Sequence, residues 1–130
     1  MDSHKFARAL ADRFQRIVPE GFRVYADRGM LWFHADAPTY GDGSSGSYIA
    51  ENIDSGGDTV EEQAAFGARR ALDELQDFVD ERSTEPWPGE RTLPVPQAQA
   101  AVIEGKLHMW FGDADAPVME CEPIDLARLD

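Results

Sequence analysis

The sequence predicts an α+β domain in which two αβββ units form an antiparallel sheet with two helices packed on one face. Apolar residues recur at helical spacing in two segments, 3–18 and 59–82. Each segment precedes a stretch in which apolar and polar side chains alternate, which is typical of half-buried strands. Two similar stretches of sequence also follow the two helices, GMLWFHADAP at 29–38 and GKLHMWFGDADAP at 105–117.

The first predicted helix covers residues 3–18, with Ser3 as the expected N-cap and Pro19 and Gly21 closing the segment. Its apolar stripe consists of Phe6, Leu10, Phe14, Ile17 and Val18. A stripe at this spacing gives an amphipathic helix that covers the sheet.

A hairpin with its turn at Arg28-Gly29 follows, and two-residue turns fix the register of their strands. On one face we expect Val24 opposite Phe33 and Ala26 opposite Leu31. On the other face we expect Tyr25 opposite Trp32 and Arg23 opposite His34. A third strand is predicted near 47–53.

Residues 41–46, GDGSSG, match G-x-G-x-x-G. The dinucleotide-binding form of this motif follows a strand and opens a helix, so that helix amides face the pyrophosphate. Here the motif leads into a strand and carries an aspartate. We therefore predict a mobile loop and no cofactor.

The second predicted helix covers residues 59–82, where Thr59 and Glu62 have the spacing of a capping box. The proline-rich residues 83–97 form an extended connector in which Trp87 covers the edge of the core. The second meander then turns at Glu104-Gly105. Its expected pairs are Val102 with Leu107 and Ala100 with Met109, followed by a strand at 117–124 and a short helix at the end. The chain is predicted to be one domain, with units at 1–58 and 59–130. The sequence leaves open the order of the strands and whether the two meanders join into one sheet.

Composition limits the functional classes. The formal charge is −13, and no cluster of basic residues is present for phosphate contacts, so we expect no nucleic-acid partner. No stretch approaches the length of a membrane span, which predicts no membrane partner. The single cysteine, Cys121, is expected in the core of a cytoplasmic protein.

Strand parity places the candidate site on the face without helices, because Leu31, Phe33, Leu107, Met109 and Phe111 share the face toward them. The candidate ligand- or partner-binding residues are Arg23, Tyr25, Trp32, His34, His108 and Trp110, joined by Glu120 and Glu122 if the last strand keeps the same parity. Aromatic walls with titratable groups suit a ligand pocket. A half-solvated sheet face stabilised by cross-strand aromatic pairs is the alternative.

Two further groups of residues carry weaker signals. The acidic helix surface, Asp73, Asp77, Asp80 and Glu81, crowds a helix C-terminus where the macrodipole favours cations, so it is either a partner surface or a solvated face. The spacing of His34, Asp36, His108, Asp113 and Asp115 lacks a metal-ligand pattern, and we predict no metal site.

The phrase LHMWFGDADAPVMECEPI, with LDELQDFVDE and PWPG before it, resembles small acidic bacterial proteins without an assigned function. The order helix, three strands, helix and further strands resembles type III secretion chaperones and YbjN-like proteins. The resemblance implies a small, acidic, dimeric protein that binds other proteins. Three strands after the second helix, where the chaperones have two, are a departure from that pattern.

The leading functional prediction is a protein–protein interaction or chaperone-like adaptor, a homodimer whose partner has a basic surface. No spacing of nucleophile and base is evident, which favours a non-enzymatic role. A small-molecule-binding protein or enzyme using the Trp/His face is the first alternative. An acidic inhibitor or DNA mimic is the second.

Overall fold

The computed structural model describes residues 1–36, 43–48, 57–83, 86–89 and 95–130. The elements in chain order are α1 (Ser3–Gln15), β1 (Phe22–Asp27), β2 (Met30–Ala35), β3 (Ser44–Tyr48), α3 (Val60–Arg82), β4 (Ala98–Ile103), β5 (Lys106–Gly112), β6 (Pro117–Glu120), β7 (Ile124–Asp125) and the 3₁₀ helix η1 (Leu126–Leu129). Helices and antiparallel strands in this order confirm the α+β class.

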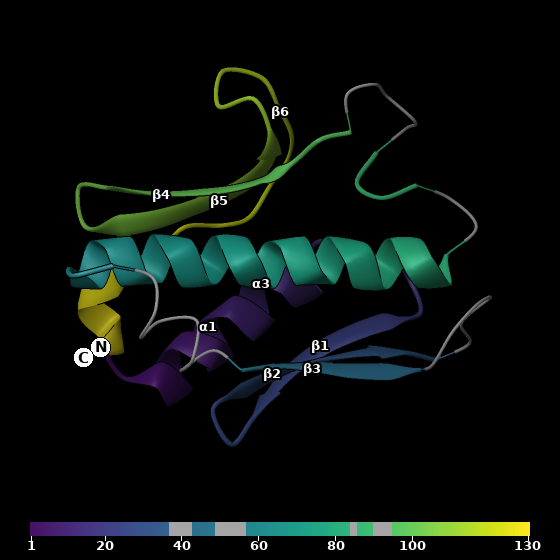
Figure 1. The fold of residues 1–130 in the computed structure, drawn as a ribbon, viewed down its shortest axis with the longest axis horizontal. Coiled ribbons are helices and arrows are strands. Elements are labelled where there is room, and N and C mark those ends of the chain that lie inside the picture. Colours follow the sequence, from purple (N-terminus) through teal and green to yellow (C-terminus); the bar gives the residue numbers. More distant parts are fainter. Residues whose placement is uncertain (37–42, 49–56, 84–85, 90–94) are drawn as a thin grey trace.

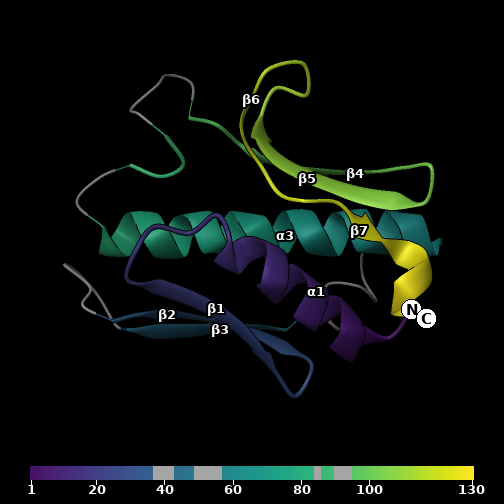
Figure 2. The same cartoon turned by 180° about the vertical axis from the view of Figure 1, so that it is seen from behind.

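The described strands form two antiparallel sheets. The first has the order β1-β2-β3, and the second has the order β4-β5-β6 with β7 also pairing with β5. Helix α3 lies between them, and α1 packs on β1 and β2 (Figures 1 and 2). The sequence leaves open whether the two meanders share one sheet; in the described residues they form two sheets, each turning one face toward the helices.

The burial pattern of α3 explains why one helix serves two sheets. Its buried positions cover about half of the helix circumference at 100° per residue, whereas a helix packed on one surface needs a stripe of roughly 100°. The Phe78 ring lies 6.1 Å from the Phe22 ring and 5.7 Å from the Phe33 ring, both in the first sheet. The buried Gln76 amide donates to Pro96 O at 2.8 Å, just before the second sheet.

Helix α1 begins differently from the prediction. Its N-cap is Asp2, not Ser3, because the Asp2 carboxylate accepts from the backbone N–H groups of His4 at 2.9 Å and Lys5 at 3.2 Å. A carboxylate at this position also interacts favourably with the helix dipole. The helix ends at Gln15 rather than at residue 18.

Helix α3 begins as predicted. Thr59 Oγ1 accepts from the Glu62 N–H at 3.1 Å. The Glu62 carboxylate accepts from Asp58 N–H at 3.2 Å, one residue before the usual capping-box partner.

Both predicted hairpin turns are confirmed. Arg28 and Gly29 have φ of 55° and 76°, and Glu104 and Gly105 have φ of 52° and 77°. Two consecutive left-handed residues form the type I′ turn, whose twist matches the strands. All of the cross-strand pairs predicted for the two hairpins are observed.

Two predicted strands have different limits. β3 begins at Ser44, so the last three residues of the G-x-G-x-x-G segment belong to a strand rather than a loop. Gly41, Asp42 and residues 49–53 lie outside the described part of the chain. The segment 117–124 is divided into β6 and β7, and the expected terminal helix is η1.

The two chain termini lie side by side (Figures 1 and 2). Asp2 N–H donates to Leu129 O at 2.6 Å, and Lys5 Nζ donates to Asp130 O at 2.6 Å. The edge of the core is closed by Trp87, as predicted, since its ring is buried at 5.3 Å from that of Phe111. No helix in the described ranges is long and apolar enough to cross a membrane.

Candidate functional site

The predicted aromatic and histidine residues lie on two surfaces rather than one. Side chains at the predicted helix-facing positions are buried in both sheets: Leu31, Phe33, Leu107, Met109 and Phe111. Their neighbours Trp32 and Trp110 alternate with them and therefore occupy the outer faces of the two sheets. Because the sheets flank α3, these outer faces point away from each other (Figure 1).

The outer face of the first sheet carries a polar network beside an aromatic pair. Asp36 Oδ1 lies 2.9 Å from Arg23 Nη2 and 3.3 Å from His34 Nε2. Tyr25, which is 48 % exposed, is the cross-strand partner of Trp32. The groups are largely solvated, and exposed ion pairs of this kind contribute about 1 kcal/mol or less.

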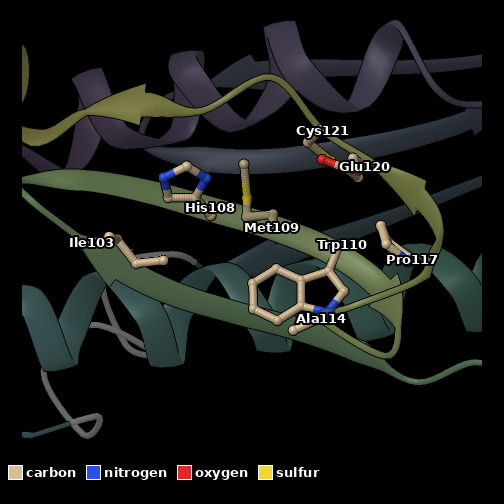
Figure 3. A pocket seen from close by; sticks show the side chains of 8 residues that line it. All are labelled: Ile103, His108, Met109, Trp110, Ala114, Pro117, Glu120 and Cys121. Carbon is tan, nitrogen blue, oxygen red and sulfur yellow. The ribbon is translucent and has the colours of Figure 1, made fainter.

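The outer face of the second sheet contains a hollow of about 160 Å³. Its lining consists of Ile103, His108, Met109, Trp110, Ala114, Pro117, Glu120 and Cys121 (Figure 3). We refer to it as the β5 hollow. Trp110 and His108 rise from the same side of β5, with Ile103 on the neighbouring strand (Figure 3).

Irregular strand pairing explains why this surface is hollowed. Trp110 pairs with Glu120, and Leu107 pairs with Ile124. The two paired positions are three residues apart on β5 but four residues apart on the other segment, which therefore contains one extra residue. The extra residue lies among residues 121–123, which separate β6 from β7, so the strand pairing is interrupted beside His108. A second irregularity in the pairing of β5 with β6 lies at Phe111/Gly112, where Gly112 has φ of 95° and the chain changes direction at the end of β5.

Three of the predicted site residues meet in the β5 hollow, namely His108, Trp110 and Glu120. Glu122 lies elsewhere, in an ion pair with Arg16 of the C-cap of α1. The sequence prediction did not include Ile103, Ala114 and Pro117 among the site residues. Strand parity could have found Ile103, since it opposes Lys106 on the face of His108 and Trp110. The signal for Ala114 and Pro117 was Gly112 followed by Pro117, two residues that commonly interrupt regular strands.

The acidic helix surface divides into residues with different environments. Burial raises the pKa of the Asp77 carboxyl, and the neighbouring carboxylates, with Asp73 first, raise it further. Asp80 accepts from the backbone N–H of Trp87 at 2.8 Å. Burial raises the pKa of Asp80, and that hydrogen bond opposes the shift. Glu81 is paired with Arg82 at 3.3 Å.

Cys121 lies in the core, and its thiol is a poor candidate for nucleophilic chemistry. Burial raises its pKa to about 12, against a weaker opposing effect of Arg13. At neutral pH the group is therefore a thiol, whereas the thiolate is the reactive form. Within the described ranges, no three His, Cys, Asp or Glu side chains converge in the way that a metal ion needs.

In comparisons with known proteins, the chain matches no family model, no curated protein and no solved structure.

Proposed function

We propose that this chain is a cytoplasmic protein-interaction module, a chaperone-like adaptor that binds a basic partner protein through the outer face of its second sheet. The observation that carries the proposal is the β5 hollow. Ile103 and Val118, exposed by 55 % and 48 %, extend the apolar surface near it. Exposed apolar groups around a concave aromatic centre are typical of protein-binding surfaces.

The size of the β5 hollow favours a partner side chain over a metabolite. Sites for drug-sized ligands occupy roughly 300–1,000 Å³. The β5 hollow, at about 160 Å³, has room for one inserted side chain. This comparison also weighs against a small-molecule-binding protein or enzyme, as does the separation of Trp32 and His34 from Trp110 and His108.

Charge indicates the kind of partner. The formal charge of −13 attracts a basic surface and speeds its encounter with this chain. The order helix, three strands, helix and further strands supports the chaperone-like reading as a fold analogy. A homodimer belongs to the same proposal, since β1 and β4 stand at the ends of their described strand orders, where strands of a second copy can pair.

The proposal is tested with Trp110→Ala and the matched variant Trp32→Ala, which changes the corresponding residue on the opposite surface. Partners are captured with each protein, identified by mass spectrometry, purified and titrated by calorimetry. We expect a purified basic partner to bind the wild type and Trp32→Ala, and to lose at least about 2 kcal/mol with Trp110→Ala, as for an interface hot spot.

Sedimentation velocity of the same proteins tests the dimer. A strict monomer whose partners bind both variants equally would overturn the proposal. Partners lost only with Asp73→Asn and Asp77→Asn would instead support the acidic inhibitor or DNA mimic.

A further inference from the structure

The β5 hollow has a fixed aromatic wall. Trp110 is half-buried in the middle of a row across three strands, with Gln99 on one side and Glu120 on the other. Its indole Nε1–H donates to Gly112 O at 3.1 Å. Because this donor is already engaged, the ring offers its π face to a ligand, and the hydrogen bond holds the ring in place before binding.

A carboxylate stands next to that wall. Glu120 is the cross-strand partner of Trp110, so both side chains emerge on the same face, and both line the hollow. In the part of the chain that the structure describes, no cation pairs with Glu120, whereas Glu122 is paired with Arg16. A negative group beside an aromatic face is the chemistry that selects a cation.

The surroundings of the hollow reinforce that selection. The second meander, residues 98–125, contains six acidic residues, Glu104, Asp113, Asp115, Glu120, Glu122 and Asp125, and one basic residue, Lys106. Arg16 of α1 neutralises Glu122, which leaves five acidic side chains against one lysine in this meander. Lys106 lies at the turn end of β5, where its cross-strand partners are Ile103 and Asp125. An anionic ligand is therefore disfavoured at this face, and a cation is favoured.

We propose that the β5 hollow is a socket for one arginine side chain of the partner protein. The guanidinium stacks on the Trp110 indole, its N–H groups donate to the Glu120 carboxylate, and its aliphatic stem lies against Ile103. Arginine fits better than lysine because its charge is planar and weakly hydrated, which suits stacking and carboxylate binding together. This assignment rests on the proposed function and names the chemistry of the partner's anchor.

The test uses three small probes with the full chain: N-acetyl-arginine amide, the lysine equivalent, and N-acetyl-citrulline amide, which has the shape of arginine without the charge. Binding is followed through the Nε1–H signals of the three tryptophans in heteronuclear NMR at about 0.15 M salt, where long-range attraction is screened. We expect the Trp110 signal to shift with arginine, less with lysine and not with citrulline. The Trp32 signal is the internal control.

Glu120→Gln removes the charge at an exposed position and is expected to weaken arginine binding about tenfold, the value of a charge-assisted hydrogen bond. Trp110→Leu is expected to lose binding, and Trp32→Leu to retain it. Dispersed amide spectra show that each variant is folded, and Glu120→Gln keeps the test decisive if Trp110→Leu unfolds.

Equal shifts with arginine and citrulline would overturn the assignment, as would arginine shifts unchanged by Glu120→Gln. The outcome is separable from that of the proposed function. A partner that needs Trp110 while the arginine probe does not bind contradicts the socket alone. A probe that binds while no partner depends on this face contradicts the proposed function alone.

Discussion

The Asp80 carboxylate accepts a hydrogen bond from the backbone N–H of Trp87 at 2.8 Å, and this bond ties the connector to α3. We expect Asp80→Ala to lower the free energy of unfolding by about 1.5 kcal/mol, the lower end of the range for hydrogen bonds to charged groups, because the Asp80 side chain is exposed. Urea unfolding followed by tryptophan fluorescence measures the loss. Asp73→Ala, an exposed change on the same helix, is the control and is expected to lie within about 0.5 kcal/mol of wild type. Equal losses in both variants would contradict the anchoring role.

Asp77 has the opposite effect on stability. Partial burial, and after it the neighbouring carboxylates, raise the pKa of Asp77, so its charged form is disfavoured in the folded state. Asp77→Asn is therefore expected to stabilise the protein at pH 7 by a few tenths of a kcal/mol, the usual size of like-charge effects on exposed helices.

The stability gained by Asp77→Asn is expected to depend on pH. A carboxyl whose pKa is raised by folding contributes stability at low pH that is lost as pH rises from the ordinary value of about 4 through the raised value. The gain from Asp77→Asn should therefore be present at pH 7 and vanish below about pH 4. Denaturation curves of both proteins at several pH values test it, and a gain that persists in acid would contradict the electrostatic cause.

Local features of this fold are predictable from the sequence because short-range chemistry determines them. The turns at Arg28-Gly29 and Glu104-Gly105 fix the register of both hairpins. The Thr59 side chain begins α3 as a capping residue does. Period-two alternation likewise separates buried from half-exposed positions in β2 and β5.

The position of one meander relative to the other does not follow from short-range patterns in the sequence. Alternation shows that Trp32 and Trp110 avoid the helices, but it does not say on which side of the helices each sheet lies. The feature that distinguishes one sheet from two is the wide buried arc of α3. Gln76 is buried beside Leu72 and Val79 and widens the packed surface of this helix. Because glutamine is polar, the sequence pattern does not mark Gln76 as part of the packed surface, and it leaves open whether the two meanders share one sheet.

The β5 hollow was only partly predictable for a similar reason. Parity placed His108, Trp110 and Glu120 on one face. The hollow itself depends on the extra residue between Glu120 and Ile124. Pro123 in this segment is a residue that interrupts strand pairing, but the alternation from 117 to 124 predicted one continuous strand.

Phe78 joins α3 to the first sheet through its contacts with the rings of Phe22 and Phe33. Phe78→Ala is expected to cost about 3–5 kcal/mol, and Phe78→Leu substantially less, because leucine fills more of the cavity. Since α3 also packs on β4, both sheets should unfold in one transition. Near- and far-ultraviolet circular dichroism with urea tests this, and non-coincident curves for wild type would show that the two sheets unfold separately.

The raised pKa of the buried Cys121 thiol predicts that the protein loses stability in alkali. Folding raises its thiol pKa from 9.0 to about 12, so the unfolded chain ionises first as pH rises. Between these values stability should fall by up to about 1.4 kcal/mol per pH unit from this group, and below pH 9 the effect should be absent. Cys121→Ala removes that term, so the wild type should lose stability relative to the variant as pH rises from 8.5 to about 10.5. Other groups that titrate in this range cancel in the difference. A constant difference between the two proteins would show that the thiol ionises equally in both states and would contradict the raised pKa.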